Sequence, residues 1–317
     1  MITLEWLYWL TGLVFAVWAV MSARDRGNGK RWGNAAFWGL LSASFLFGSQ
    51  LSDLANGVLV LALVGIAGFG GLGRSDPPTT TPQQREELAA RFGNRLFIPA
   101  LAIPLTAVVG TLLYNYSPVG GWGLFEPKRE TLILFGVGVL LALALCHAWL
   151  RPPLSAPMQE GRRLMDSIGW AAVLPQMLAA LGALFAAAGV GKVIGSLAGD
   201  IMPQGSVFLA VLLYCGGMAL FTIIMGNAFA AFPVMATAIG IPVLIHQYGG
   251  DAPVIGAVGM LAGFCGTLLT PMAANFNIVP AALLELKSQN GVIRMQAGTA
   301  IPLFACNVAI IYFLAFR

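Results

Sequence analysis

Two short stretches of this sequence place amide, hydroxyl and proline residues inside long apolar runs. The first is Gly226-Asn227-Ala228, and the second extends from Thr267 to Pro280. An amide or backbone group without a partner costs several kcal/mol in hydrocarbon, so such residues are tolerated where protein groups or a water-filled cavity satisfy them. We therefore interpret the two stretches as walls of a transport site in a membrane.

The first stretch has the residues of a helical hairpin. A helix over 207–224, a turn at 225–229 and a second helix to about 247 would place the tip at Gly226 and Asn227, since glycine permits a tight turn and asparagine caps helices. The start of the second helix would offer N–H groups and a positive dipole end to an anion. The alternative is a small-residue kink in an ordinary span, with Asn227 bonded to a neighbouring helix.

The second stretch predicts a discontinuous helix over 252–284. Pro271 removes a backbone donor and biases Thr270 away from helix. Asn275 and Asn277 would not share one face of a helix, whereas an unwound stretch lets both point into one cavity. Amide oxygens and freed carbonyls suit a hard cation such as Na⁺. The candidate contacts for substrate or cation are Thr267, Thr270, Pro271, Asn275 and Asn277, together with Gly226, Asn227 and Ala228. The alternative is a polar contact between helices or a loop between spans.

Gln176 is a further candidate contact. It follows Pro175 inside the apolar segment 167–190, where the proline would kink the helix. Its amide could hydrogen-bond a substrate or another helix, and the sequence favours neither.

The composition indicates what must hold these residues in place. The chain has 317 residues, 58% hydrophobic and 9% charged, whereas a soluble domain carries about 25% charged residues. The apolar runs are continuous, which favours helices over a barrel. We predict an all-α polytopic membrane protein with about eight spanning helices, plus the hairpin 207–247 and the discontinuous helix 252–284. The other spans are expected at 3–22, 33–50, 54–73, 96–114, 131–149, 167–190 and 297–316.

The positions of the basic residues set the expected orientation. Thirteen of the 17 Lys and Arg residues lie in loops 23–32, 74–95, 150–166 and 285–296, and the other four lie in segments on the opposite side. This asymmetry predicts that the four loops lie in the cytoplasm and that the N-terminus lies outside. This count of basic residues fits a single orientation only if segment 207–247 begins and ends on the same side of the membrane. Two full spans and one re-entrant hairpin would both satisfy this condition.

Three parts follow from this layout. Residues 1–73 would form an N-terminal three-span unit, 74–95 a cytoplasmic loop with a short surface helix over 83–91, and 96–317 the unit that holds the transport site. The first apolar run lacks a preceding basic segment, so we expect a retained span rather than a cleaved signal peptide.

Several functions are disfavoured by what the sequence lacks. No acidic or basic residue lies centrally in a predicted span, which favours Na⁺ coupling through neutral oxygens and leaves H⁺ open. There is no Walker A sequence, HExxH motif or Ser/His/Asp set, so we expect no enzyme and no bound cofactor. Two distant histidines and four dispersed cysteines predict neither a metal site nor disulfides. The sequence has no basic helix with interleaved aromatic residues, so we do not expect nucleic-acid binding.

The stretch Thr270-Pro271-Met272-Ala273-Ala274-Asn275-Phe276-Asn277-Ile278-Val279-Pro280-Ala281-Ala282, the turn Gly226-Asn227-Ala228-Phe229 and the start Glu5-Trp6-Leu7-Tyr8-Trp9-Leu10-Thr11-Gly12 together resemble a bacterial membrane family. It is catalogued as domain-of-unknown-function family 979 and described as a subunit of a 5-oxoproline (pyroglutamate) transporter. The resemblance covers essentially the whole chain. The family is similar to the ion-transporter superfamily of organic-anion and citrate carriers, which pair a re-entrant hairpin with a discontinuous helix in each of two inverted repeats.

The resemblance implies a secondary carrier for a small carboxylate, with Asn227 at the hairpin tip and Thr270, Asn275 and Asn277 in the unwound helix as contacts. Hairpin tips in that superfamily usually carry a Ser-Asn-Thr-like triplet, where this chain has Gly226-Asn227-Ala228. One hairpin with one broken helix is evident, so the resemblance implies that a second membrane subunit or a second copy of this chain completes the site. A scaffold or regulatory subunit of a partner permease, without transport of its own, is the alternative function.

Overall fold

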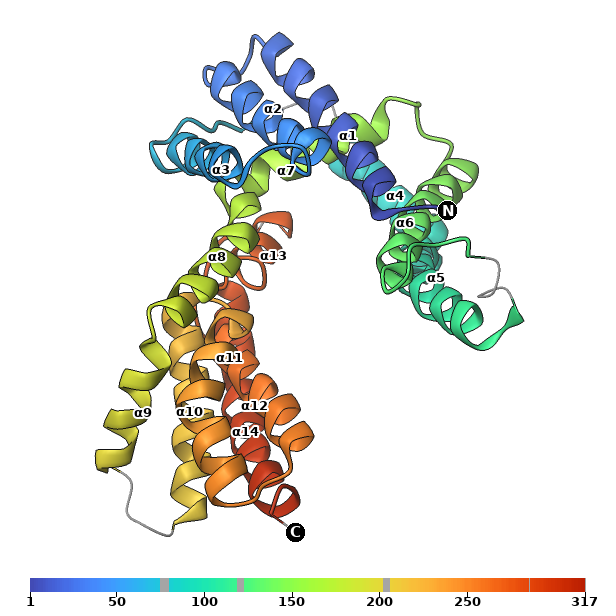
Figure 1. Cartoon of the computed structure of the whole chain (residues 1–317). Coiled ribbons are helices and arrows are strands. Elements are labelled where there is room, and N and C mark those ends of the chain that lie inside the picture. Colours follow the sequence, from blue (N-terminus) through green and yellow to red (C-terminus); the bar gives the residue numbers. More distant parts are fainter. Residues whose placement is uncertain (75–79, 119–122, 202–205, 285, 317) are drawn as a thin grey trace. The chain divides into compact units, whose positions relative to one another are not determined.

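The chain folds into helices throughout the part that the structure describes. This computed structural model describes residues 1–74, 80–118, 123–201, 206–284 and 286–316, and the β contact within them is an isolated bridge between Ile2 and Phe125. Within these ranges, six helices are long and apolar enough to cross a membrane, and shorter apolar helices accompany them (Figure 1). The predicted all-α, multi-pass membrane fold is confirmed.

The first of two compact units comprises Met1–Gly169. Its helices pack pairwise, α1 against α2 and α5 against α6. Small residues permit the close approach, since a Cβ atom at Gly12 would lie 2.6 Å from the side chain of Leu46. The elements are α1 Leu4–Arg24, α2 Arg31–Phe47, α3 Asp53–Gly68, α4 Pro82–Phe92, η1 Gly93–Leu96, α5 Phe97–Tyr116, α6 Glu130–Leu150 and α7 Ala156–Ile168.

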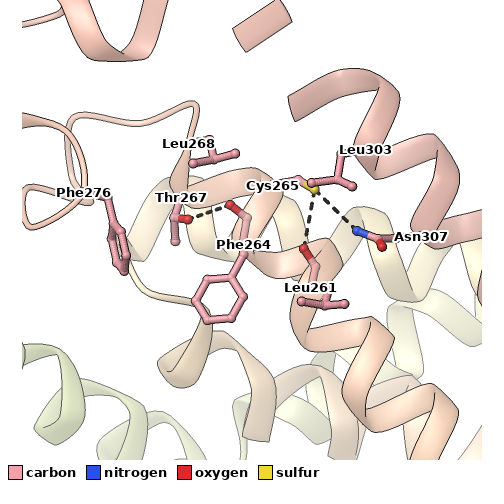
Figure 2. Close-up of a pocket in the computed structure, with 8 residues that line it drawn as sticks. All are labelled: Leu261, Phe264, Cys265, Thr267, Leu268, Phe276, Leu303 and Asn307. Atoms are coloured by element: carbon pink, nitrogen blue, oxygen red, sulfur yellow. Dashed lines mark hydrogen bonds between the residues drawn. The ribbon is translucent and has the colours of Figure 1, made fainter. Parts of the chain in front are cut away.

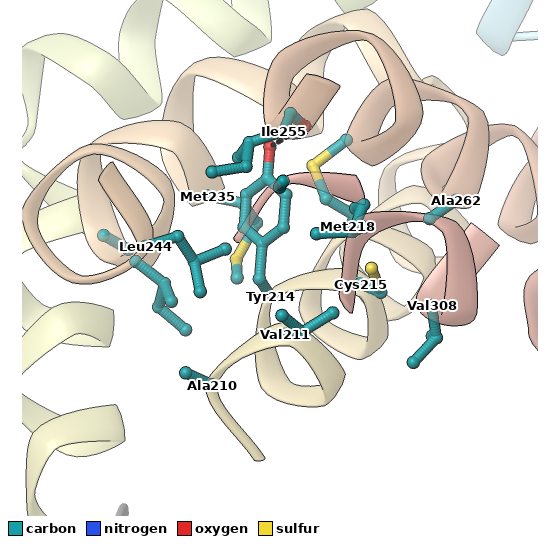
Figure 3. Close-up of a cluster of buried hydrophobic side chains, with 14 of the residues drawn as sticks. Ala210, Val211, Tyr214, Cys215, Met218, Met235, Leu244, Ile255, Ala262 and Val308 are labelled. Carbon is teal, nitrogen blue, oxygen red and sulfur yellow. Dashed lines mark hydrogen bonds between the residues drawn. The ribbon is translucent and has the colours of Figure 1, made fainter. Parts of the chain in front are cut away.

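The second unit comprises Trp170–Arg317 and contains both polar stretches. Its core surrounds the buried ring of Tyr214, which packs among Met218, Met235 and Leu244 (Figure 3). The elements are η3 Gly169–Val173, α8 Leu174–Ala187, α9 Val190–Ile201, α10 Val207–Met225, α11 Ala228–Met235, the π-helical segment η4 Ala236–Gln247, α12 Ala252–Thr267, α13 Ile278–Leu283 and α14 Gly291–Leu314.

The predicted helical hairpin is present, with its turn at the predicted residues. Helix α10 ends at Met225, and α11 begins at Ala228. The two arms run antiparallel, because Gly217 packs against Met235 and Gly240, farther along the second arm, packs against Tyr214. Whether the tip stops within the membrane stays a prediction.

The predicted discontinuous helix is also present. Helix α12 ends at Thr267, residues 268–277 form turns, and α13 resumes at Ile278 for six residues. Below, residues 268–277 are called the break. It begins three residues before Pro271, as expected from the missing donor of the proline and the bias against helix at the residue before it.

The segment 167–190 differs from the single span expected of it. It contains the end of α7, the turn η3 and helix α8, whose 14 residues reach about 21 Å, short of the roughly 30 Å of a hydrocarbon core. Gly169 and Gly189 have φ of +57° and +69° and bound the pieces. Both values lie where glycine is favoured, so the glycines interrupt the helix despite the apolar sequence.

The short surface helix predicted over 83–91 is confirmed as α4, whose N-terminus has a capping box between Thr81 and Gln84. Residues 75–79 of the predicted cytoplasmic loop lie outside the described residues. The assignment of residues 1–73, 74–95 and 96–317 to separate roles stays a prediction.

Candidate functional site

The hairpin tip and the break are in direct contact. Gly226 is buried with φ of +78°, and a Cβ atom on it would clash with the main-chain oxygen of Met272 in the break. Glycine therefore meets two requirements here, a left-handed backbone and a close approach between two main chains. The contact joins two stretches that are more than 40 residues apart in the sequence.

Asn227 caps the second arm of the hairpin. Its Oδ1 accepts a 2.8 Å hydrogen bond from the N–H of Phe229, and the residue is half-buried. Ala228, the first residue of α11, is fully buried. The predicted helix start is thus present, with the dipole and first-turn N–H groups that could attract an anion.

Thr270 ties the break to the end of α10. Its Oγ1 donates a 2.8 Å hydrogen bond to the main-chain oxygen of Ile223 and accepts a 3.2 Å bond from the N–H of Met272. The side chain is buried, whereas the following Pro271 is exposed. A single hydroxyl therefore joins the two halves of the candidate site.

Asn277 organises the interior of the break. It is fully buried, and its Nδ2 donates to the main-chain oxygens of Thr267 at 2.8 Å and Thr270 at 2.7 Å. These carbonyls no longer have helical partners because the helix stops there. Its Oδ1 is also buried and has no hydrogen-bond partner in the described part of the chain. The hydroxyl of Thr267 bonds to the main-chain oxygen of Phe264 in its own helix.

The two asparagines of the break do not meet in one cavity. Asn275 is exposed while Asn277 is buried, so the prediction that both point into one cavity is not met in this structure. Burial in the break changes after every two residues: Ala273 and Ala274 are buried, Asn275 and Phe276 are exposed, and Asn277 is buried again. Gln176 lies in α8, but its side chain is outside the described part of the chain.

The sequence analysis did not identify two polar residues near the break. Thr222 on α10 is fully buried, its Oγ1 has no partner within the described residues, and a Cβ atom on Gly263 would lie 3.4 Å from that oxygen. Asn307 on α14 is buried and lines a pocket beside the break (Figure 2). The sequence features that could have indicated them are the hydroxyl of Thr222, one helical turn before Gly226, and the amide of Asn307 within the last apolar span.

The candidate site contains no basic side chain. The sequence has no Lys or Arg between Lys192 and Lys287, so a bound anion would rely on N–H groups and a co-bound cation. Nor is there a cluster of three or more His, Cys, Asp or Glu side chains suited to a metal ion anywhere in the described ranges.

A separate buried polar cluster lies in the first unit and was not predicted. The Asp166 Oδ1 atom accepts from Trp38 Nε1 at 2.9 Å and Asn34 Nδ2 at 3.1 Å, and Arg162 forms an ion pair with Asp25 at 3.3 Å. The cluster anchors α7, through Arg162 and Asp166, to α1 and α2. It shows that α7 buries charged residues toward the N-terminal helices.

Comparison with known proteins identifies a protein family. A family model described as "Protein of unknown function (DUF979)" matches residues 5–316, which is nearly the whole chain. No curated protein and no solved structure matched.

Proposed function

This chain belongs to the DUF979 family, and we propose that it is a subunit of a secondary active transporter for a small organic carboxylate, with 5-oxoproline as the first candidate substrate. In this proposal the tip and the break form the substrate and cation site. Alternating access would open this site first to one side of the membrane and then to the other. The chain would act in the membrane together with a second membrane subunit or a second copy of itself.

One observation carries the proposal: the Oδ1 atom of Asn277 is buried and has no hydrogen-bond partner among the described residues. Leaving such an oxygen unpaired costs about 1–3 kcal/mol, so a buried amide oxygen beside an unwound backbone calls for a ligand. Na⁺ is a cation that neutral oxygens suit, and the Thr222 hydroxyl, which has no partner within the described residues, is a second buried neutral oxygen in this region. The carboxylate would bind at the N-terminus of α11, which Asn227 caps.

Uptake of labelled 5-oxoproline tests the proposal. The chain would be expressed alone and together with a candidate second membrane subunit, and uptake into vesicles would be measured with an inward Na⁺ gradient, an inward H⁺ gradient and neither. We expect uptake that requires a gradient and that falls at least tenfold in Asn227→Ala and Asn277→Ala. The absence of gradient-dependent uptake of any small carboxylate, with or without the partner, would refute it.

A scaffold role without transport is the second candidate, and one observation favours it. The amide of Asn277 and the hydroxyl of Thr270 already bind main-chain oxygens of this chain, as purely structural residues would. Complex assembly separates the two candidates. A carrier loses uptake in Asn227→Ala while the subunits still purify together, whereas a scaffold retains uptake in every variant that assembles.

A further inference from the structure

A pocket lies beside the break, on the side that faces α14. Its volume is about 260 Å³, just below the roughly 300–1,000 Å³ of typical small-molecule pockets, so it has room for a small metabolite. The carbonyl of Thr267, one of its lining residues, accepts a hydrogen bond from Asn277, and another lining residue, Phe276, directly precedes Asn277. The pocket therefore shares a wall with the candidate site. Its lining comprises Leu261, Phe264, Cys265, Thr267, Leu268, Phe276, Leu303 and Asn307 (Figure 2).

Thr267 and Asn307 bear the polar side chains of this lining apart from the Cys265 thiol, and the Thr267 hydroxyl already donates to the main-chain oxygen of Phe264. Asn307 is 2% exposed, and its Nδ2 donates to the Sγ of Cys265 at 3.6 Å (Figure 2). A thiol sulfur is a weak acceptor, so this bond returns little of the cost of burying an amide in an apolar helix. The amide has two donor hydrogens and an acceptor oxygen, and one hydrogen and the oxygen form an edge complementary to another amide.

We propose that this pocket is a recognition subsite for the uncharged body of the transported molecule, a compact apolar ring or short chain with one amide-like group. The inference rests on the proposed transport function and extends it. The Phe264 and Phe276 rings would contact the apolar faces of the ligand, and Asn307 would pair with its amide group. Asn307 is then the residue that determines specificity, because a buried hydrogen-bonding edge rejects an analogue that cannot satisfy it.

Two acids of equal ring size test the role of Asn307. 5-Oxoproline carries a lactam in its ring, and cyclopentanecarboxylate has the same ring without it. Each would compete against uptake of labelled 5-oxoproline in wild type and Asn307→Leu. We expect the wild-type preference for the lactam to fall about tenfold in the variant, while inhibition by cyclopentanecarboxylate is kept. Equal weakening of both acids would mean that Asn307 only packs α14 against α12, and would overturn the inference. Thr299→Val, on the same helix outside the pocket, should leave the preference unchanged.

A binding measurement keeps the inference independent of transport and of the folding of Asn307→Leu. Leu303 is 50% exposed at the pocket and would be changed to cysteine in a chain with Cys146, Cys215 and Cys306 as alanine and Cys265 as serine. We expect 5-oxoproline to slow alkylation of this cysteine by N-ethylmaleimide more than cyclopentanecarboxylate does, and to leave a cysteine at Thr299 unaffected. Protection without uptake would support the subsite and count against the proposed carrier function. Uptake without protection would overturn the subsite alone.

Discussion

The hydroxyl of Thr270 donates a 2.8 Å hydrogen bond to the main-chain oxygen of Ile223. Ile223 lies in the last turn of α10, where carbonyl oxygens have no partner within their own helix. The break of one helix thus satisfies the open end of another. This bond and the contact between Gly226 and Met272 make the tip and the break one structural unit.

Removing that hydroxyl should loosen the unit. Thr270→Val keeps the shape and leaves the Ile223 oxygen unpaired, which should lower the free energy of unfolding by about 1–3 kcal/mol. Thr270→Ser keeps the hydroxyl and should recover most of the loss. Unfolding of the purified protein in detergent with increasing SDS measures both variants. Equal stability of the valine and serine variants would show that the bond does not contribute.

Adding a methyl group at Gly226 should be costly. Gly226→Ala places a Cβ against the Met272 oxygen and strains a left-handed backbone, so we expect about 1–3 kcal/mol of lost stability and reduced uptake. Gly216, inside α10, has nothing within 4 Å of its Cβ position, and Gly216→Ala should be neutral or stabilising. Thermal denaturation in detergent compares the pair, and similar shifts in both would contradict the close contact.

The two asparagines of the break should behave differently. Asn277→Ala leaves the carbonyls of Thr267 and Thr270 without their partner, and each costs about 1–3 kcal/mol when buried. Asn275 is exposed, so Asn275→Ala should change stability by less than about 0.5 kcal/mol. The yield and melting temperature of folded protein in detergent report the difference. A fall in stability for Asn275→Ala as large as that for Asn277→Ala would contradict the arrangement.

The ion pair between Arg162 and Asp25 should contribute more than its neighbour on the same helix. Their side chains are 7% and 20% exposed, and removal of one partner of a buried pair costs about 3–5 kcal/mol. The pair between Arg163 and Glu160 is more exposed, so Arg163→Met should cost under about 1 kcal/mol. A double-mutant cycle with Arg162→Met and Asp25→Asn measures the coupling, and a value near zero would contradict the prediction.

Single cysteines test the predicted orientation. Lys128 and Glu87 are both exposed and lie on opposite sides in the charge-based topology. In a chain without its native cysteines, a membrane-impermeant maleimide should label Lys128→Cys on intact cells and Glu87→Cys only after the membrane is opened. The reverse pattern would place the N-terminus inside.

The sequence determined the membrane class, the turn at Gly226 and the break near Pro271. These features depend on local properties, namely apolar runs, a proline without a donor and a glycine that tolerates positive φ. The tertiary structure decided which distant groups the polar residues contact. It separated Asn275 from Asn277, joined Thr270 to Ile223, and brought Asn307 from the last helix to the pocket beside the break.

The same distinction explains the buried cluster around Asp166. From the sequence, Asp166 is expected to be exposed to water, because it lies at the end of an apolar segment. Its hydrogen-bond partners, Asn34 and Trp38, are more than 120 residues away, so its neighbours along the chain do not predict the contact. The sequence by itself therefore determined which polar groups interrupt the apolar runs, but not that Asp166 is buried. The fold alone selected which distant groups satisfy them, since burial and hydrogen bonding depend on contacts between helices rather than on the order of residues within one.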